Sequence, residues 1–233
     1  RRFSYMKVLN IGSMNLDHVY NVDHIILPGE TQATTGLNLF LGGKGMNQSI
    51  ALAKAGVEVY HGGMIGKDGY AFIDACKEYG VHYDYIREAE GNTGHTIIQI
   101  DKNAQNSILL FAGTNDMLTE SYVDEVIADF EEGDILLLQN EVNMLPYMVD
   151  KAYEKGMQIA LNPSPFNEKL NDVDMSKISY FLMNEVEGGQ ITGFSEPEKI
   201  IDRVVELYPE AKIVLTLGSD GAIYADKNVR YHQ

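Results

Sequence analysis

The chain has 233 residues, of which 45% are hydrophobic and 22% are charged, so it contains enough apolar material for the core of one ordinary globular domain. Its 34 acidic and 18 basic side chains leave a formal net charge of −16, which argues against a nucleic-acid or an anionic-membrane partner. No apolar run approaches the ~20 residues of a membrane span, and the single cysteine excludes an internal disulfide, so we expect a soluble, cytoplasmic protein.

Strand-like and helix-like segments alternate along most of the chain. In chain order they are the strand Lys7–Ser13, the helix Gly45–Ala55, the strand Val57–Ile65, the helices Ala71–Tyr79 and Thr119–Phe130, the strand Asp134–Asn140, the helix Leu145–Lys155, the strands Gln158–Asn162 and Ile178–Asn184, a helix that ends at Leu207, and the strand Lys212–Leu217. Ser195 and Glu198 have the spacing of a capping box at the start of that last helix. The alternation predicts an α/β fold, a Rossmann-like parallel sheet with helices on both faces.

Two stretches interrupt this alternation. His18–Val22 and Thr34–Phe40 read as extended segments without a helix between them, and His95–Ile100 and Ser107–Phe111 read as a hairpin. Together they predict a small antiparallel sheet inserted at about residues 17–40 and 93–112. We call this sheet the lid, because an insertion beside a ligand crevice is well placed to cover it.

Polar residues follow four of the predicted strands, where open parallel sheets bind their ligands. These residues are Asn15 and Asp17, Asn140 and Glu141, Asn184 with Glu185 and Glu187, and the segment Gly218–Gly221. Because the carboxyl ends of parallel strands share one edge of a sheet, they predict the rim of an active site.

A glycine-rich segment, Gly42–Asn47, opens the first predicted helix. Glycines let a backbone approach a ligand closely, and the first N–H groups of a helix are free donors. The spacing fits neither the Walker phosphate loop nor the dinucleotide fingerprint. On its own the segment also fits a tight turn that carries a solvated lysine.

Three side chains in the first two predicted groups are suited to sugar hydroxyls. The carboxylate of Asp17 can accept from two adjacent hydroxyls, and the amide of Asn15 can both donate and accept. Both residue types are also common in turns, and Glu141 equally fits a solvated loop.

The later groups are suited to a nucleotide and its metal. Asn184 and Glu187 stand at the start of a helix, where an amide can reach phosphate and a carboxylate can hold hydrated Mg²⁺. The position of Glu187 is also explained by a favourable interaction of its carboxylate with the helix dipole. Thr216, Gly218 and Gly221 form a loop that fits either a nucleotide or a simple turn.

In combination the chain resembles the ribokinase-like carbohydrate kinase family. The resemblance rests on seven segments in the family's order: Gly12–Asp17, Pro28–Glu30, Gly42–Gln48, Gln139–Glu141, Leu161–Pro165, Asn184–Glu187 and Thr216–Gly221. It implies ATP-dependent phosphorylation of the terminal hydroxyl of a pentose, with D-ribose as the first candidate. A kinase of deoxyribose or of a nucleoside, and a non-catalytic sugar-binding module, are the alternatives.

The resemblance also implies a role for each matching residue. The sugar would be held by Asn15, Asp17, Gly43, Lys44, Gly45, Asn47 and Glu141. ATP would contact Asn184, Thr216, Gly218, Ser219 and Gly221, and Glu187 would organise Mg²⁺. The family's Gly-Ala-Gly-Asp motif with the catalytic base, and its ligands for a monovalent cation such as K⁺, do not occur before Gln233. We therefore expect residues 6–233 to be one domain that is incomplete at its C-terminus and inactive alone, with Arg1–Tyr5 as a cloning remnant or an incomplete start.

The lid also predicts an assembly. Its strands carry the apolar residues Leu37, Leu39, Ile97, Leu109 and Phe111, which we expect strand alternation to divide between the two faces. Exposed apolar patches of this kind usually mark an interface. Because the resemblance implies lids paired across a two-fold axis, we predict a homodimer joined through the lids.

Overall fold

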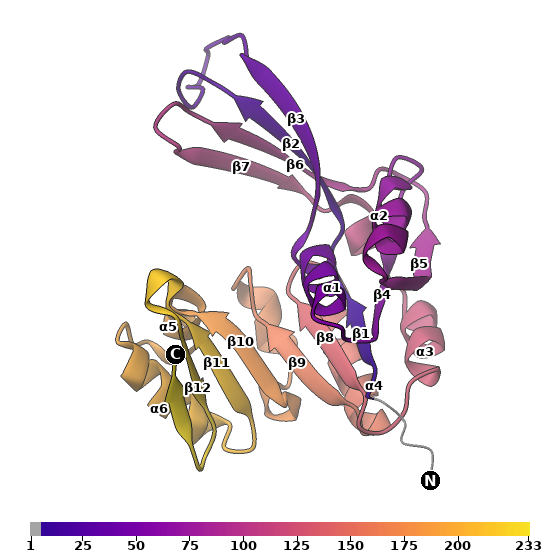
Figure 1. Cartoon of the computed structure of the whole chain (residues 1–233), viewed down its shortest axis with the longest axis vertical. Helices are drawn as coiled ribbons and strands as arrows, with labels where there is room; N and C mark the ends of the chain where they lie inside the picture. Colours follow the sequence, from indigo (N-terminus) through magenta and orange to yellow (C-terminus); the bar gives the residue numbers. More distant parts are fainter. Residues whose placement is uncertain (1–5) are drawn as a thin grey trace.

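The structure is a computed structural model that describes residues 6–233. Its main sheet has the order β13-β12-β11-β10-β9-β8-β1-β4-β5 (Figure 1). The strands are β1 Val8–Ile11, β4 Val59–Ile65, β5 His82–Glu88, β8 Ile135–Gln139, β9 Gln158–Asn162, β10 Tyr180–Asn184, β11 Lys212–Thr216, β12 Ala222–Ala225 and β13 Arg230–His232. All neighbours from β5 to β11 are parallel, whereas β12 and β13 pair antiparallel. The predicted α/β fold is confirmed.

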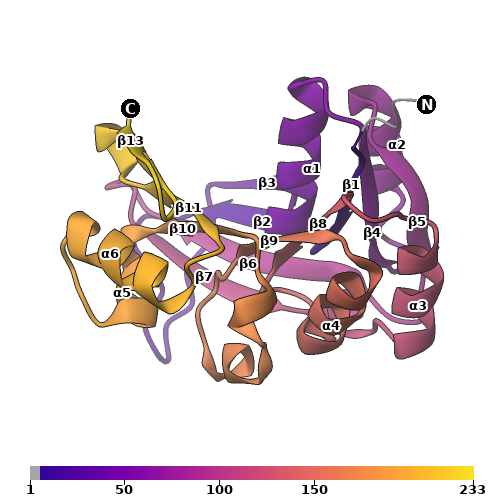
Figure 2. The ribbon, with the colours of Figure 1, turned by 90° about the horizontal axis from the view of Figure 1, so that it is seen from below.

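Six helices flank this sheet among the described residues. They are α1 Lys44–Lys54, α2 Ala71–Tyr79, α3 Glu120–Ala128, α4 Leu145–Lys155, α5 Glu185–Thr192 and α6 Pro197–Leu207. Figure 2 shows α1 and α2 on one face and α3 to α6 on the other. On the face of α1, no helix of residues 6–233 covers β10 and β11, so Leu182 and Val214 stay only half-buried.

The core lies on both faces of the central strands β1 and β8. Leu9 and Leu136 are fully buried on the side of α3 and α4, while Val8 and Leu137 pack with the cluster around Met46 of α1 on the other side. A strand that is buried on both faces needs apolar side chains at consecutive positions. This requirement explains the uninterrupted apolar run of β8. The packing on both faces holds the carboxyl ends of the strands in fixed positions.

The lid is a separate four-stranded sheet with the order β3-β2-β6-β7, which stands away from the main sheet in Figure 1. Its strands are β2 Asn15–Asn21, β3 Gly36–Gly42, β6 Gly94–Ile100 and β7 Asn106–Phe111. The outer pairs are antiparallel as predicted, but the central pair of β2 and β6 is parallel. The chain returns to the main sheet between β3 and β6, so β6 leaves that sheet in the same direction as β2.

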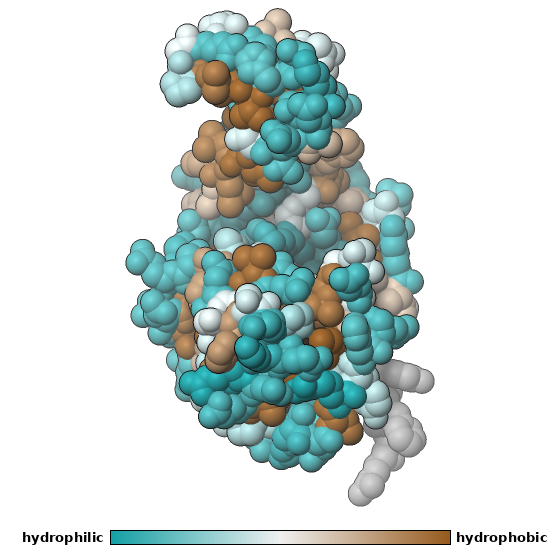
Figure 3. All heavy atoms as spheres, turned by 90° about the vertical axis from the view of Figure 1, so that its left-hand side faces the viewer, coloured by the Kyte–Doolittle hydropathy of each residue, from teal (hydrophilic) through white to brown (hydrophobic). Residues whose placement is uncertain are grey.

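The register of the lid corrects one expectation about its faces. His18 pairs with both Leu39 and Ile97, and Ile97 pairs in turn with Leu109. The same register places Leu37 and Phe111 on that face as well, so strand alternation does not divide the five apolar residues. Leu109 is 68% exposed, and hydrophobic side chains gather on the lid in the upper part of Figure 3. Asp17 and its partner Thr96 lie on the opposite face.

One local prediction is wrong and one strand was missed, each for an identifiable reason. The capping box at Ser195 does not form, because Pro197 occupies the first helical position of α6 and makes Glu196 the N-cap, which has no side-chain capping bond. Strand β5 was not predicted, because most of its side chains are exposed at the sheet edge and its sequence lacks an apolar run. The segment 1–5 lies outside the described residues, so our interpretation of it stays open. No helix within residues 6–233 is both long and apolar enough to cross a membrane.

Candidate active site

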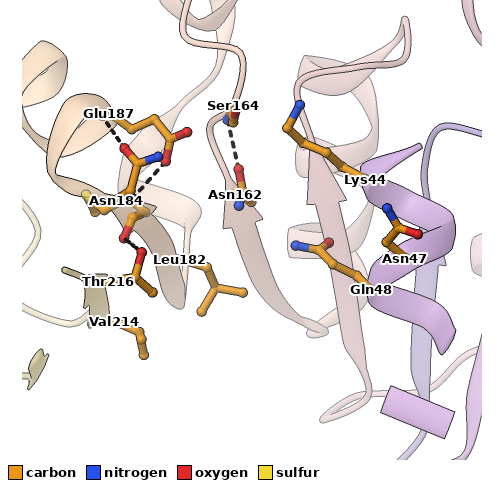
Figure 4. Close-up of a pocket in the computed structure, with 11 residues that line it drawn as sticks. Lys44, Asn47, Gln48, Asn162, Ser164, Leu182, Asn184, Glu187, Val214 and Thr216 are labelled. Carbon is orange, nitrogen blue, oxygen red and sulfur yellow. Dashed lines mark hydrogen bonds between the residues drawn. The ribbon is translucent and has the colours of Figure 1, made fainter. Parts of the chain in front are cut away.

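A pocket of about 520 Å³ lies where β9, β10 and β11 end, between α1 and the start of α5 (Figure 4). Its wall is formed by Lys44, Asn47, Gln48, Asn162, Ser164, Leu182, Met183, Asn184, Glu187, Val214 and Thr216. Both predicted groups of binding residues, the one for sugar and the one for nucleotide, contribute to this wall. The pocket therefore brings together segments that are far apart in the sequence.

Glu141 and Lys44 form an ion pair beside this pocket. Glu141 Oε1 lies 2.5 Å from Lys44 Nζ, and the side chain of Glu141 is only 8% exposed. Its other oxygen, Oε2, accepts hydrogen bonds from the Lys44 backbone N–H at 3.1 Å and from the Ser13 hydroxyl. A buried carboxylate with three donors has a fixed position, so the alternative of a solvated loop residue does not hold for Glu141.

The first N–H groups of α1 are not free donors, and that expectation is corrected. The N–H of Lys44 donates to Glu141, that of Gly45 donates to Ser13 Oγ at 3.3 Å, and that of Met46 donates to Ser13 O at 3.0 Å. The N-terminus of α1 thus binds the protein's own oxygens. What this helix offers to the pocket is its side chains.

Two glycines of the segment Gly42–Asn47 are required by packing. Gly43 has φ +93°, a conformation that side chains rarely adopt, and a Cβ there would lie 2.5 Å from Ser13 O. A Cβ on Gly45 would lie 2.5 Å from the backbone carbon of Gly12. These contacts press the start of α1 against the end of β1, which places Lys44 beside Glu141.

Asn15 and Asp17 lie within strand β2 of the lid, so neither is a turn residue. Asn15 Oδ1 accepts from Asn115 Nδ2 at 2.8 Å, and Asp17 Oδ1 accepts from Thr96 Oγ1 at 2.6 Å. Oδ2 of Asp17 accepts no hydrogen bond from the described residues. Neither residue lines the pocket wall, and their predicted contact with a sugar stays a prediction.

Asn184 and Glu187 cap α5 through reciprocal hydrogen bonds. Asn184 Oδ1 accepts from the Glu187 N–H at 3.0 Å, and Glu187 Oε2 accepts from the Asn184 N–H at 2.9 Å (Figure 4). Both residues nevertheless line the pocket, so the capping role is compatible with a ligand contact, which stays a prediction. Oε1 of Glu187 is not used by the cap.

The remaining predicted nucleotide residues lie just after β11. Gly218 and Ser219 belong to a short 3₁₀ turn, Gly218–Asp220, and Gly221 packs so closely on Gln233 that a Cβ would meet its carbonyl oxygen. None of the three lines the pocket, and their role stays a prediction. Thr216, which does line it, donates from Oγ1 to the Met183 carbonyl at 3.5 Å.

Three polar pocket residues were missed from the sequence, Gln48, Asn162 and Ser164, as were the apolar residues Leu182, Met183 and Val214. Gln48 follows Lys44 by four positions, and this spacing puts both on the same face of α1, so helical periodicity is a signal that could have found it. Asn162 ends β9, and its Oδ1 accepts from the Ser164 N–H at 3.0 Å. Both belong to a segment that already matched the family.

Comparison with known proteins shows the family to which the chain belongs. Residues 6–233 match the model of the pfkB family carbohydrate kinases. The chain belongs to the pfkB family. Among carbohydrate kinases, a ribokinase of Haemophilus influenzae is 31% identical over 226 residues, which cover 93% of this chain and 74% of that protein. A deoxyribokinase of Salmonella typhi is 26% identical over 244 residues, which cover 97% of this chain and 77% of that protein.

The solved structures show the same kinase fold. A ribokinase from Cryptococcus neoformans, determined in complex with ADP, superimposes with a TM-score of 0.82 at 29% identity, over 98% of this chain and 78% of that one. The resemblance found in the seven sequence segments is therefore confirmed at the level of family and fold. Within this pfkB-family chain, the pocket between α1 and α5 is the candidate active site.

Proposed function

We propose that this chain binds the two substrates of an ATP-dependent pentose kinase that converts D-ribose to ribose 5-phosphate. The observation that carries the proposal is the pocket itself, in which Lys44, paired with Glu141, lies on one side and the Asn184–Glu187 cap on the other. The ribokinase relative supports D-ribose as the substrate. The deoxyribokinase relative favours deoxyribose as the second candidate.

The sugar side of the proposal rests on two carboxylates. Oδ2 of Asp17 is available to accept from sugar hydroxyls, and Glu141, held by Lys44, presents a fixed negative charge near the same end of α1. Phosphoryl transfer depends mainly on positioning and charge neutralisation. Asp17 and Glu141 would fix the sugar's orientation, and the lid would exclude water when it covers the sugar.

The nucleotide side rests on Asn184, Thr216 and Glu187. Mg²⁺ prefers one or two carboxylates with waters and phosphate oxygens as its remaining ligands. Glu187 fits this role, because it is buried at the pocket and keeps Oε1 outside the cap. No group of three or more acidic, His or Cys side chains forms a metal cluster within residues 6–233. Bound Mg²⁺ would neutralise phosphate charge.

We infer that the general base is not among the described pocket residues. Glu141 is held by three donors, and Glu187 is assigned to Mg²⁺ in this proposal, so neither carboxylate is assigned the proton of a sugar hydroxyl. The 233-residue chain should therefore bind ligands without forming sugar phosphate. A form extended by ~70 residues, sized from typical domain lengths, should turn over.

We also propose that the protein is a homodimer joined through the face of the lid that carries His18. That face carries Leu37, Leu39, Ile97, Leu109 and Phe111, each between 40% and 68% exposed. A patch of this size on an isolated sheet is unfavourable in water and typical of an interface. A two-fold dimer would bury it on both partners.

Calorimetric titration and a coupled ADP assay test the proposed function. We expect the chain to bind ribose and Mg–ADP, and the extended form to release ADP in proportion to ribose. Faster turnover on deoxyribose than on ribose would favour the second candidate. If the extended form binds sugar without turnover, the protein is a sugar-binding module. Ribose-dependent ADP release by the 233-residue chain would contradict the inference that the general base is absent from it.

A further inference from the structure

Five polar side chains form a continuous hydrogen-bonded chain from the middle of the main sheet to the pocket. His61 Nδ1 lies 2.8 Å from Ser49 Oγ, which accepts from Asn10 Nδ2 at 2.8 Å. Gln139 Nε2 then donates to Asn10 Oδ1 at 3.0 Å and to Gln48 Oε1 at 2.6 Å. The first four side chains are completely buried, and Gln48 reaches the pocket wall. We call these five residues the polar relay.

A backbone carbonyl fixes the direction of the bonds between Asn10, Gln139 and Gln48 in the polar relay. Asn10 Nδ2 also donates to the carbonyl oxygen of Gly45 at 2.7 Å, and a carbonyl can only accept. The nitrogen of Asn10 therefore faces α1, and its oxygen faces Gln139. Gln139 must present its NH₂ group there, and the second hydrogen of that group requires the oxygen of Gln48.

The buried end of the polar relay is a neutral imidazole. Burial lowers the pKa of His61 to about 4, an effect that the backbone of Gly12 only partly opposes, so the ring is neutral at pH 7. Ser49 Oγ accepts from Asn10 and is hydrogen-bonded to His61 Nδ1, and either neutral tautomer of the ring fits that bond, because a hydroxyl has one hydrogen and two lone pairs. The carbonyl of Gly45 therefore sets the donors from Asn10 to Gln48.

It follows that the NH₂ group of Gln48 has no partner in the polar relay. In Figure 4 the Gln48 side chain extends from α1 into the pocket with its nitrogen at the tip. Lys44 lies one helical turn earlier on the same wall. Two groups that can only donate, an ammonium and an oriented amide NH₂, therefore face the pocket from one side of α1, and such a pair matches an anionic oxygen.

We propose that Gln48 is a ligand-binding residue that donates to a phosphate oxygen, and that the polar relay holds it in the donating orientation. This inference rests on the proposed function, since the phosphate belongs to ATP or to the sugar phosphate. Gln48 would touch the ligand directly. Gln139 and Asn10 would be positioning residues, which act only through Gln48.

Substitutions at Gln48 test the ligand contact. Gln48→Met removes the donor at similar size, and Gln48→Glu places a negative oxygen in its place. A hydrogen bond to a charged group is strong enough that we expect Gln48→Met to weaken Mg–ADP or ribose 5-phosphate binding at least ~10-fold, and Gln48→Glu to weaken it further. The ligand that loses affinity identifies the phosphate. Ribose affinity should stay within about twofold, and Gln105→Glu, an exposed control in the lid, should change nothing. Unchanged affinity of Gln48→Met for both phosphate ligands would overturn the proposal.

A double-mutant comparison tests the positioning role of Gln139. Gln139→Met frees the Gln48 amide, so it should weaken phosphate binding in the unaltered background and have no effect on binding in the Gln48→Met background. A merely structural role would weaken binding in both backgrounds and so contradict the relay.

Side-chain amide hydrogen exchange, followed by NMR on the unaltered chain, keeps the relay testable if Gln139→Met does not fold. We expect the NH₂ of Gln139 to be protected and that of Gln48 to exchange freely and to shift when Mg–ADP is added. The reverse pattern would refute the relay. A chain that binds neither ribose nor Mg–ADP would refute the proposed function and the ligand of Gln48, while the exchange pattern still decides the relay.

Discussion

His61 makes the stability of the fold depend on pH in a predictable direction. The ring is fully buried in β4, and burial lowers its pKa from 6.5 to about 4. Between these values the unfolded chain binds a proton that the folded chain does not. The contribution of His61 to the free energy of unfolding is therefore fully present above pH 6.5 and is lost as the pH falls toward 4. With about 1.4 kcal/mol per pKa unit, this single group should remove about 2 kcal/mol of unfolding free energy between pH 7 and pH 5.

Urea unfolding at pH 7, 6 and 5 measures this contribution when it is compared with His61→Gln, which cannot take up the proton. The substitution lowers stability at every pH, but its pH dependence should be flatter by about 2 kcal/mol over this range. His24, whose pKa the hydrogen bond to Glu30 raises, contributes with the opposite sign, and it cancels because both proteins contain it. Equal slopes in the two proteins would show that His61 is not held neutral by burial.

Three further changes test the site and the lid. Asp17→Ala should lower kcat/KM for ribose at least ~10-fold in the extended protein, through loss of charge-assisted hydrogen bonds, with ATP affinity measured without sugar unchanged; intact sugar kinetics would remove Asp17 from the site. Glu187→Ala should lower the free energy of unfolding in urea by about 1 kcal/mol through loss of the α5 cap, and it should raise the Mg²⁺ concentration needed for activity. Glu187→Gln should retain the cap and change only the Mg²⁺ requirement. Equal stability of all three forms would contradict the capping role. Leu109→Asp should halve the particle mass in light scattering near 0.15 M salt, and a monomer before substitution would refute the lid dimer.

The main sheet was predictable because its strands have a strong local signal. β8 carries four apolar residues in succession, since it is buried on both faces, and glycines such as Gly56 and Gly156 end the adjoining helices. Strand β5 has one neighbour and exposes most of its side chains, so the same signal is absent there. Local patterns thus identify the interior of this fold better than its edges.

Part of the pocket wall was predictable from the sequence, but the contacts of its residues were not. Asn184 with Glu187 and Ser195 with Glu198 show the same capping pattern in the sequence, and only the first pair forms a cap, because Pro197 shifts the start of α6. The bond from Ser13 to Glu141 joins residues 128 positions apart. Such a contact depends on the register of β1 against β8, which no local pattern contains.

The central place of β1 determines the order in which this chain can fold during synthesis. β1 emerges first, yet it is completed only when β8 pairs with it, as in the pairing of Val8 with Ile135. Ribosomes add roughly 5–20 residues per second, so after β4 has formed, one edge of β1 stays open for several seconds. An open apolar strand edge is a site of mispairing. After β8, each of β9, β10 and β11 pairs with the strand just before it, so the rest of the parallel sheet grows as fast as it is made.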